Sequence, residues 1–141
     1  MRPTLLRVGC AVALATSCRH PMDPAVAGPL ARAASIRLYE VVTGDDWTAH
    51  IPLTHGYTVR LQVRLYAADG RQIQPLQDQV AMSFVFTPDS LATAVTADSL
   101  LLLEDVTPTA SVGTGGNLNV TLTAPAIGTT KTFGPFSVLV H

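Results

Sequence analysis

From Ser35 onward, apolar and polar residues alternate in short runs that clusters of turn residues separate. The alternation is clearest over residues 59–65, VRLQVRL, where every second residue is apolar. Successive side chains of a strand point to opposite faces, so this run predicts a core strand with one buried and one wet face. Comparable runs occupy residues 36–42, 47–53, 80–86, 92–96, 100–106, 118–123 and 133–140.

Turn residues lie between these runs at the spacing of an all-β domain. They include residues 43–46 (TGDD), Asp69-Gly70, residues 87–90 (TPDS), residues 113–117 (GTGGN) and residues 125–130. Asp-Gly favours a tight turn because both residues tolerate a positive φ. Seven to eight short strands with such turns predict an antiparallel β-sandwich.

Leu100–Leu103 is the run that also suggests a helix, with residues 97–99 as a cap. Its short length and its flanks, Thr96 and Val106 among them, favour a strand buried on both faces. Amphipathic helical spacing never extends beyond two turns, which argues against a parallel α/β fold.

The first residues have the layout of a bacterial secretion signal. Residues 1–7, MRPTLLR, carry two arginines and no acid, and residues 8–16, VGCAVALAT, form an apolar run that ends in small residues. A membrane-spanning helix needs about 20 apolar residues, and this run is much shorter. Residues 1–17 are therefore predicted to be a signal peptide.

The segment Leu14–Cys18, LATSC, resembles the lipobox of bacterial lipoproteins. The resemblance implies that Cys18 is acylated and becomes the mature N-terminus. An anchor of two or more acyl chains holds a protein firmly on a membrane. Arg19 stands where an aspartate would favour retention in the inner membrane, so the resemblance implies the outer membrane. The alternative is ordinary cleavage after Ala15, which would leave Cys18 as a free thiol because Cys10 leaves with the signal.

Residues 18–34 are predicted to be an unstructured tether that follows the lipid. Pro21, Pro24 and Pro29 favour extended conformations, and neither helical nor alternating periodicity is present. His20 and Asp23 are interpreted as solvated linker residues. The folded domain is expected to cover residues 35–141.

Several segments of that domain resemble bacterial immunoglobulin-like domains of the invasin and intimin type. The resemblance rests on residues 56–63 (GYTVRLQV), on residues 65–70 (LYAADG) and on residues 88–94 (PDSLATA), with a closing hairpin over residues 121–140. It implies an immunoglobulin-like sandwich that acts as a binding or spacer module on the cell envelope.

Composition and net charge argue against several classes of function. The formal net charge is −1, charged residues make up 13% of the chain and apolar residues 48%, so the chain is expected to fold and lacks the basic patch of a nucleic-acid binder. No combination of nucleophile, base and stabiliser stands out, so neither an enzyme nor a cofactor is predicted. Glu104 and Asp105, adjacent in a strand, should point to opposite faces and are interpreted as surface charges.

The leading hypothesis is a non-catalytic, lipid-anchored binding or structural module that presents a sheet face or a loop end to an envelope protein or a glycan. Candidate anchors for a partner are the large amphipathic side chains Trp47, Tyr39, Tyr57 and Tyr66, of which Tyr66 lies on the polar face of its strand. The alternative is a small periplasmic metal-binding protein. It would use His50, His55 and His141, with Asp45 or Asp46, because imidazole and carboxylate suit zinc or copper.

Overall fold

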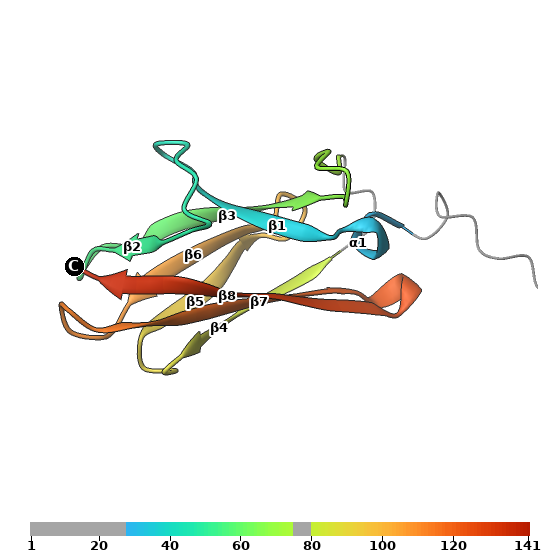
Figure 1. The fold of residues 1–141 in the computed structure, drawn as a ribbon. Helices are drawn as coiled ribbons and strands as arrows, with labels where there is room; N and C mark the ends of the chain where they lie inside the picture. Colours follow the sequence, from blue (N-terminus) through green and yellow to red (C-terminus); the bar gives the residue numbers. More distant parts are fainter. Residues whose placement is uncertain (1–27, 75–79) are drawn as a thin grey trace, which may run out of the picture.

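The structure, a computed structural model, describes residues 28–74 and 80–141, and these residues form two sheets packed face to face (Figure 1). Sheet A has the strand order β1-β3-β6-β5, and sheet B has the order β2-β8-β7-β4. In sheet A the strands are β1 (Ser35–Glu40), β3 (Val59–Tyr66), β6 (Leu103–Pro108) and β5 (Ala92–Asp98). In sheet B they are β2 (Ile51–Leu53), β8 (Thr129–Val140), β7 (Gly115–Ala124) and β4 (Ala81–Thr87). The predicted all-β sandwich is confirmed.

Strands that are distant in sequence lie side by side in both sheets. The order β1-β3-β6-β5 facing β4-β7-β8 is similar to the ABED and CFG order of immunoglobulin-type sandwiches. Strand β2 adds a short parallel partner to β8, while the other pairings are antiparallel. The chain thus crosses between the sheets after β1, so that its first two strands lie in different layers.

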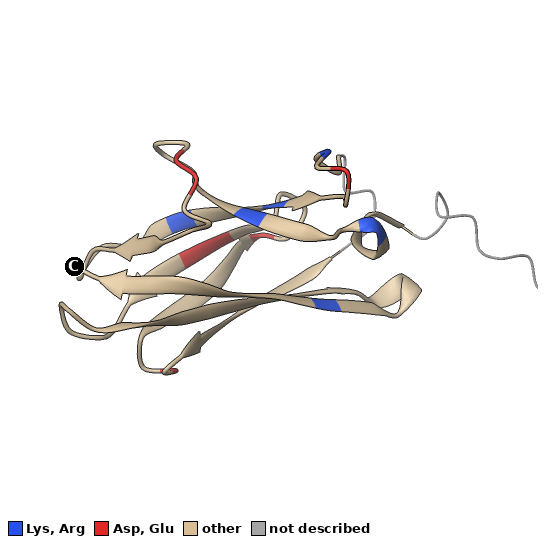
Figure 2. Ribbon diagram, viewed as in Figure 1, with Lys and Arg blue, Asp and Glu red and all other residues tan. Residues whose placement is uncertain are grey.

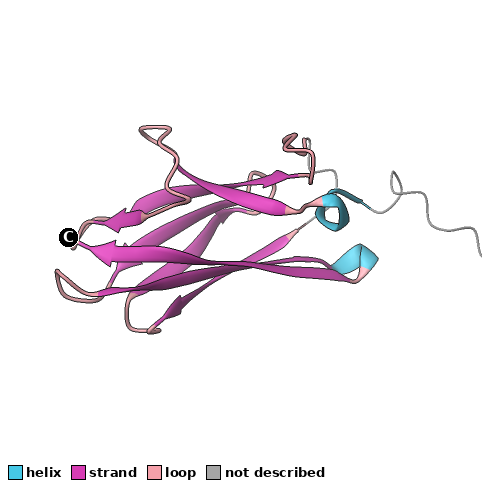
Figure 3. Cartoon of the chain, viewed as in Figure 1, coloured by secondary structure: helices cyan, strands magenta, loops and turns pink. Residues whose placement is uncertain are grey.

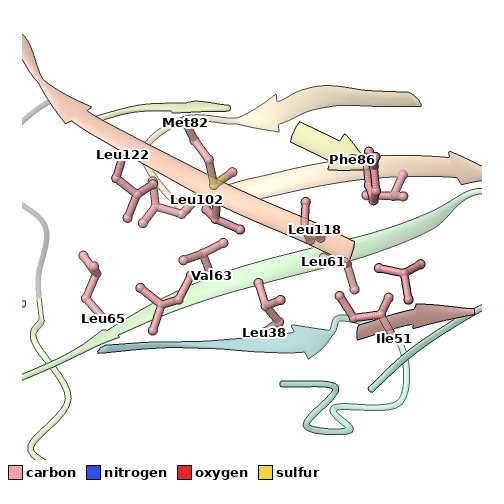
Figure 4. Close-up of a cluster of buried hydrophobic side chains, with 14 of the residues drawn as sticks. Leu38, Ile51, Leu61, Val63, Leu65, Met82, Phe86, Leu102, Leu118 and Leu122 are labelled. Atoms are coloured by element: carbon pink, nitrogen blue, oxygen red, sulfur yellow. The ribbon is translucent and has the colours of Figure 1, made fainter. Parts of the chain in front are cut away.

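Alternating apolar residues from both sheets form the core between them (Figure 4). On β3, Leu61, Val63 and Leu65 are buried as the sequence pattern predicts. Leu118 and Leu122 of β7 are buried in the opposite sheet. Burial of a leucine side chain contributes about 1.5–3 kcal/mol, so this core is the main source of stability.

The folded domain begins earlier than the sequence predicts. Residues 28–32 form the short helix α1 (Gly28–Arg32), seen in Figure 3 at one end of the sandwich, and Leu30 is 0% exposed. The Lys131 ammonium of β8 donates hydrogen bonds to the carbonyl oxygens of Ala31 and Ala33, at 2.8 and 2.6 Å. Buried structure is thus present before Ser35, and the sequence pattern does not reveal it because one helical turn is too short to show a period. No helix of the described residues has the length and apolarity that crossing a bilayer requires.

The segment before β2 is a loop where the sequence predicts a strand from Trp47. Two hydrogen bonds connect this loop to the backbone of Leu38. The Leu38 carbonyl oxygen accepts from the Trp47 N–H at 2.8 Å, and the Leu38 N–H donates to the Thr48 hydroxyl oxygen at 2.9 Å. A side-chain hydroxyl takes the place of a ladder partner here. Strand β2 consequently begins only at Ile51.

The predicted strand at Leu100 is also wrong, because residues 99–102 form the turn between β5 and β6. Asp98 Oδ1 accepts the N–H groups of Leu100 and Leu101 at 2.8 and 3.0 Å, and Leu102 has a φ of 52°. Aspartate competes with strand pairing through such local hydrogen bonds. As a result Leu102 is buried, while Leu100 and Leu101 are 63% and 57% exposed.

Two glutamates are buried, and their environments differ. The Glu40 carboxylate accepts the N–H groups of Val42 and Thr43 at 2.9 and 2.6 Å. Burial alone would raise the pKa of Glu40, but these hydrogen bonds outweigh it and hold the pKa below its usual value. Glu40 therefore stabilises the turn as a carboxylate.

Glu104 faces the core, which corrects its interpretation as a surface charge. It pairs with Leu61 across the sheet, is 3% exposed, and has one oxygen without a hydrogen-bond partner. Burial raises the pKa of this carboxyl, and a hydrogen bond from Thr96 only partly offsets that effect. Asp105 points to the opposite face, as predicted, and forms an ion pair with Arg60.

Glu104 should make the domain less stable as the pH rises. Its pKa is higher in the folded chain than in the unfolded chain, so the folded state binds more protons between the two values. We expect Glu104→Gln to remove this slope and to raise the free energy of unfolding near pH 8, because the amide has no charge to desolvate. Urea unfolding at several pH values between about pH 4 and pH 8 measures this free energy and its dependence on pH.

Glu40→Gln is the control, because the pKa of Glu40 is lowered and its stabilising contribution is lost as the pH falls. The two variants should change the pH profile in opposite directions. If the free energy of unfolding depended on pH equally in Glu104→Gln and in the unmodified chain, Glu104 would not be the source of the slope.

Gly116 lies where β7 passes close to the β4–β5 turn. A Cβ there would collide with the carbonyl oxygen of Thr87 and with the buried Leu91 side chain, whereas a Cβ on Gly115 would meet its nearest atom at 3.6 Å. We expect Gly116→Ala to lower the free energy of unfolding by about 1–3 kcal/mol, as overpacking does. Gly115→Ala should change it much less, and chemical denaturation of both variants compares them. If both variants lost the same free energy of unfolding, the close contact of Gly116 with Thr87 and Leu91 would not explain the loss.

Candidate functional site

The two outer faces of the sandwich differ in charge. The strands of sheet A carry three arginines and four carboxylates, of which Glu40 and Glu104 are buried, whereas Lys131 is the charged residue in the strands of sheet B (Figure 2). The outer face of sheet B instead carries threonines. The hydroxyls of Thr121 and Thr132 form a hydrogen bond at 2.9 Å, and those of Thr123 and Thr130 form one at 3.2 Å. Charged recognition chemistry is therefore available on sheet A.

Two arginines and two tyrosines form a cluster on the outer face of β1 and β3. This arginine–tyrosine cluster consists of Arg37, Tyr39, Arg64 and Tyr66. The Arg37 guanidinium lies 4.9 Å from the centre of the Tyr66 ring, and the Arg64 guanidinium lies 4.1 Å from that of Tyr39. The two tyrosine hydroxyls are 3.3 Å apart and share a hydrogen bond.

The register of the sheet explains this arrangement. Arg37 and Arg64 are direct cross-strand partners, and like charges in that position repel each other. Each arginine extends to the diagonal neighbour on the opposite strand, where it meets a tyrosine ring. A cation over an aromatic face contributes about 0.5–1 kcal/mol at an exposed site. The stacking therefore separates the two charges and fixes both guanidinium planes.

The arginines of this face differ in how their charge is balanced. Arg60 makes two hydrogen bonds to Asp105, at 2.7 and 2.9 Å, which hold the pKa of that carboxyl below its usual value. Arg37 lies 3.8 Å from Asp46. Arg64 donates from Nε to the Gln62 side-chain oxygen at 2.8 Å, and within residues 28–74 and 80–141 it has no carboxylate partner. Arg64 is thus the arginine of β3 that remains able to bind an anion.

A groove of about 500 Å³ adjoins Arg64. Its walls come from β3, from the segment after the Asp69-Gly70 turn, and from the β5–β6 turn. The side chains that give it its chemistry are Gln62, Arg64, Gln72, Gln74, Leu100 and Leu101. The polar lining residues Gln62, Arg64, Gln72 and Gln74 thus share an open site with two exposed leucines.

Two backbone hydrogen bonds occupy groups on the edge of β3 beside the groove. The Val63 N–H bonds the carbonyl oxygen of Leu102 at 3.0 Å, and the Ile73 N–H bonds that of Leu65 at 2.8 Å. These backbone groups are unavailable to an added strand. A ligand of the groove therefore cannot use these two groups without displacing Leu102 or Ile73.

Of the four aromatic residues predicted as partner anchors, Tyr39 and Tyr66 meet in the cluster. Trp47 is half-buried against the core, and Tyr57 lies apart in a loop, 68% exposed. Sequence reasoning missed Arg37 and Arg64. The signal was present, because Arg-Leu-Tyr occurs at residues 37–39 and again at residues 64–66, each time within an alternating run.

The candidate metal ligands come only partly together. The rings of His50 and His141 meet edge to face with centres 6.4 Å apart. His55 uses Nδ1 for the carbonyl oxygen of Ala110 at 3.0 Å, and Asp46 accepts the Thr48 N–H. In the described part of the chain, no three histidine, cysteine or acidic side chains are grouped so that they could hold a metal ion. Cys18, His20 and Asp23 lie outside the described residues.

The hydrogen bond between the Tyr39 and Tyr66 hydroxyls can be tested by titration. The pKa of Tyr66 is above its usual value, first because of the hydrogen bond with Tyr39 and then because of burial. We expect Tyr39→Phe to lower the Tyr66 pKa, which NMR of the tyrosine ring carbons measures during an alkaline titration. Tyr57→Phe is the matched control and should leave it unchanged. An unaltered Tyr66 pKa in Tyr39→Phe would mean that the two hydroxyls do not interact.

Comparison with known proteins adds no family to this description. Neither the protein-family models nor the curated proteins include a match to the chain. The interpretation of the cluster and the groove therefore rests on their geometry and on the chemistry of their side chains.

Proposed function

We propose that this chain is a non-catalytic, lipid-anchored module of the bacterial cell envelope, which binds a partner through the outer face of sheet A. The observation that carries the proposal is the arginine–tyrosine cluster beside the groove. Tyrosine and arginine are enriched where proteins bind partners, since both combine a large contact area with directed hydrogen bonds. Within residues 28–74 and 80–141, the threonine-lined face of sheet B has no comparable cluster.

Attachment to the membrane follows from the sequence at residues 1–18. Lipidation of Cys18 and removal of residues 1–17 would place the chain on an envelope membrane, and Arg19 favours the outer one. Nine residues separate Cys18 from Gly28, the first residue of α1. Since a chain extends at most about 3.6 Å per residue, the domain would stay within about 40 Å of the lipid. A partner in the envelope would lie within reach.

An immunoglobulin-like module of the invasin and intimin type is the architecture that we propose for this role. The sandwich order of the strands and the resemblance of residues 56–70 support it. Such a fold by itself specifies no activity, so the functional part of the proposal depends on the cluster and the groove.

A photocrosslinking experiment in the envelope tests both the anchor and the face. Benzoylphenylalanine is placed in the full-length chain either at Ser35, an exposed residue beside Tyr66 on sheet A, or at Thr132, an exposed residue on sheet B. We expect the chain to be recovered with membranes, fatty acid to be found on Cys18 by mass spectrometry, and crosslinks to form from position 35 only.

Two controls separate the parts of the proposal. Cys18→Ser should release the chain from the membrane without altering the fold. Equal crosslinking from positions 35 and 132 would contradict the assignment of the face, and a mature N-terminus at any residue other than Cys18 would contradict the anchor.

A further inference from the structure

We propose that the groove beside Arg64 binds a sugar that carries a carboxylate. This inference rests on the proposed function and names the class of ligand that the face of sheet A would recognise. Three properties of the groove support it: a guanidinium that has no carboxylate partner among the described residues, the amides of its lining residues, and two paired backbone groups on the adjoining edge of β3.

Arg64 is held in place before any ligand arrives. Its guanidinium stacks on the Tyr39 ring at 4.1 Å, and its Nε is fixed by the Gln62 oxygen at 2.8 Å. The two terminal nitrogens keep donors that can pair with both oxygens of a carboxylate. Because the guanidinium is already oriented, less side-chain freedom is lost on binding.

The charge of the groove matches a single negative charge. Among the described residues that line the groove, Arg64 is the one cationic residue, and the neighbouring Arg60 is already neutralised by Asp105. A carboxylate carries one charge, whereas a phosphate monoester carries about −1.5 to −2 at neutral pH. A carboxylate is therefore the better match.

The other groove side chains suit the hydroxyls and the ring of a sugar. Gln62, Gln72 and Gln74 each present an amide, which both donates and accepts hydrogen bonds as a hydroxyl requires. Leu100 and Leu101, both more than half exposed, form an apolar wall against which the C–H face of a ring can lie. The volume of about 500 Å³ falls within the range of small-molecule sites, roughly 300–1,000 Å³.

The groove is less suited to a peptide. A peptide that binds beside a strand gains its affinity from free backbone groups of that strand. The N–H of Val63 and the carbonyl oxygen of Leu65 on this edge of β3 are already paired, to Leu102 and Ile73 respectively. An acidic peptide would thus lose two of the backbone partners that strand addition to β3 requires.

Calorimetry with a defined pair of sugars tests the inference. The probes are a disaccharide that ends in glucuronic acid and its methyl ester, which differ in one negative charge, each titrated into the full-length chain. We expect the acid to bind about tenfold or more tightly than the ester, because a hydrogen bond to a charged group contributes about 1.5–3 kcal/mol. Arg64→Gln should lose this preference, and the Arg64 Nε–H NMR signal should shift when the acid is added to the unmodified chain.

Arg71→Gln is the matched control. Arg71 lies near the groove and carries the same charge, but it does not line the groove and its side chain is 88% exposed. This variant should keep the preference for the acid within about twofold of the unmodified chain. A loss equal to that of Arg64→Gln would overturn the inference, since general electrostatic attraction would then account for binding.

Three further results would overturn the inference. They are equal binding of acid and ester by the unmodified chain, the absence of binding by either sugar, and a peptide ending in glutamate that displaces the acid at lower concentration. If crosslinks from position 35 persist in any of these cases, the proposed function stands and only the ligand class is wrong. If those crosslinks are also absent, the proposed function fails as well.

Discussion

The burial of alternate residues between the two sheets determines everything that the outer surface can present. Once Leu61, Val63 and Leu65 are buried in the core, their neighbours in sequence must face solvent, because a shift of one residue would exchange the two faces completely. Strand β1 obeys the same constraint through Leu38. The arginines and tyrosines of the two strands are therefore brought together by hydrophobic packing, which fixes the backbone from which the cluster projects.

Charge is handled differently in the two layers. Sheet A holds nearly all the charges of the strands, and most of these are neutralised locally, Arg60 by Asp105 and Glu40 by backbone N–H groups. Two groups are not matched in this way. Glu104 remains in the core with an unpartnered oxygen, and Arg64 remains on the surface without a carboxylate among the described residues. The first lowers stability at high pH, and the second leaves the surface able to recognise an anion.

The sequence predicts the sandwich and its core strands well, because burial on one face imposes a period of two that is visible directly, as in residues 59–65. It fails where short-range hydrogen bonds replace strand pairing, at Thr48 before β2 and at Asp98 before Leu100. It also fails at α1, where a single turn carries no period. Within the site, Tyr39 and Tyr66 were predicted, but their arginine partners depend on cross-strand register, and the groove depends on a turn that the sequence pattern assigned to a strand.

Strand β1 also has a mechanical consequence. If the chain is tethered through Cys18, drag on the domain is transmitted to α1 and then along the axis of β1. The residue pairs from Ser35–Tyr66 to Glu40–Leu61 would then be loaded together in shear, and not broken one after another as in unzipping. Because α1 is pinned by Lys131 and by the burial of Leu30, it must detach before β1 bears the load. The end of the domain nearest the membrane would therefore be built to withstand tension.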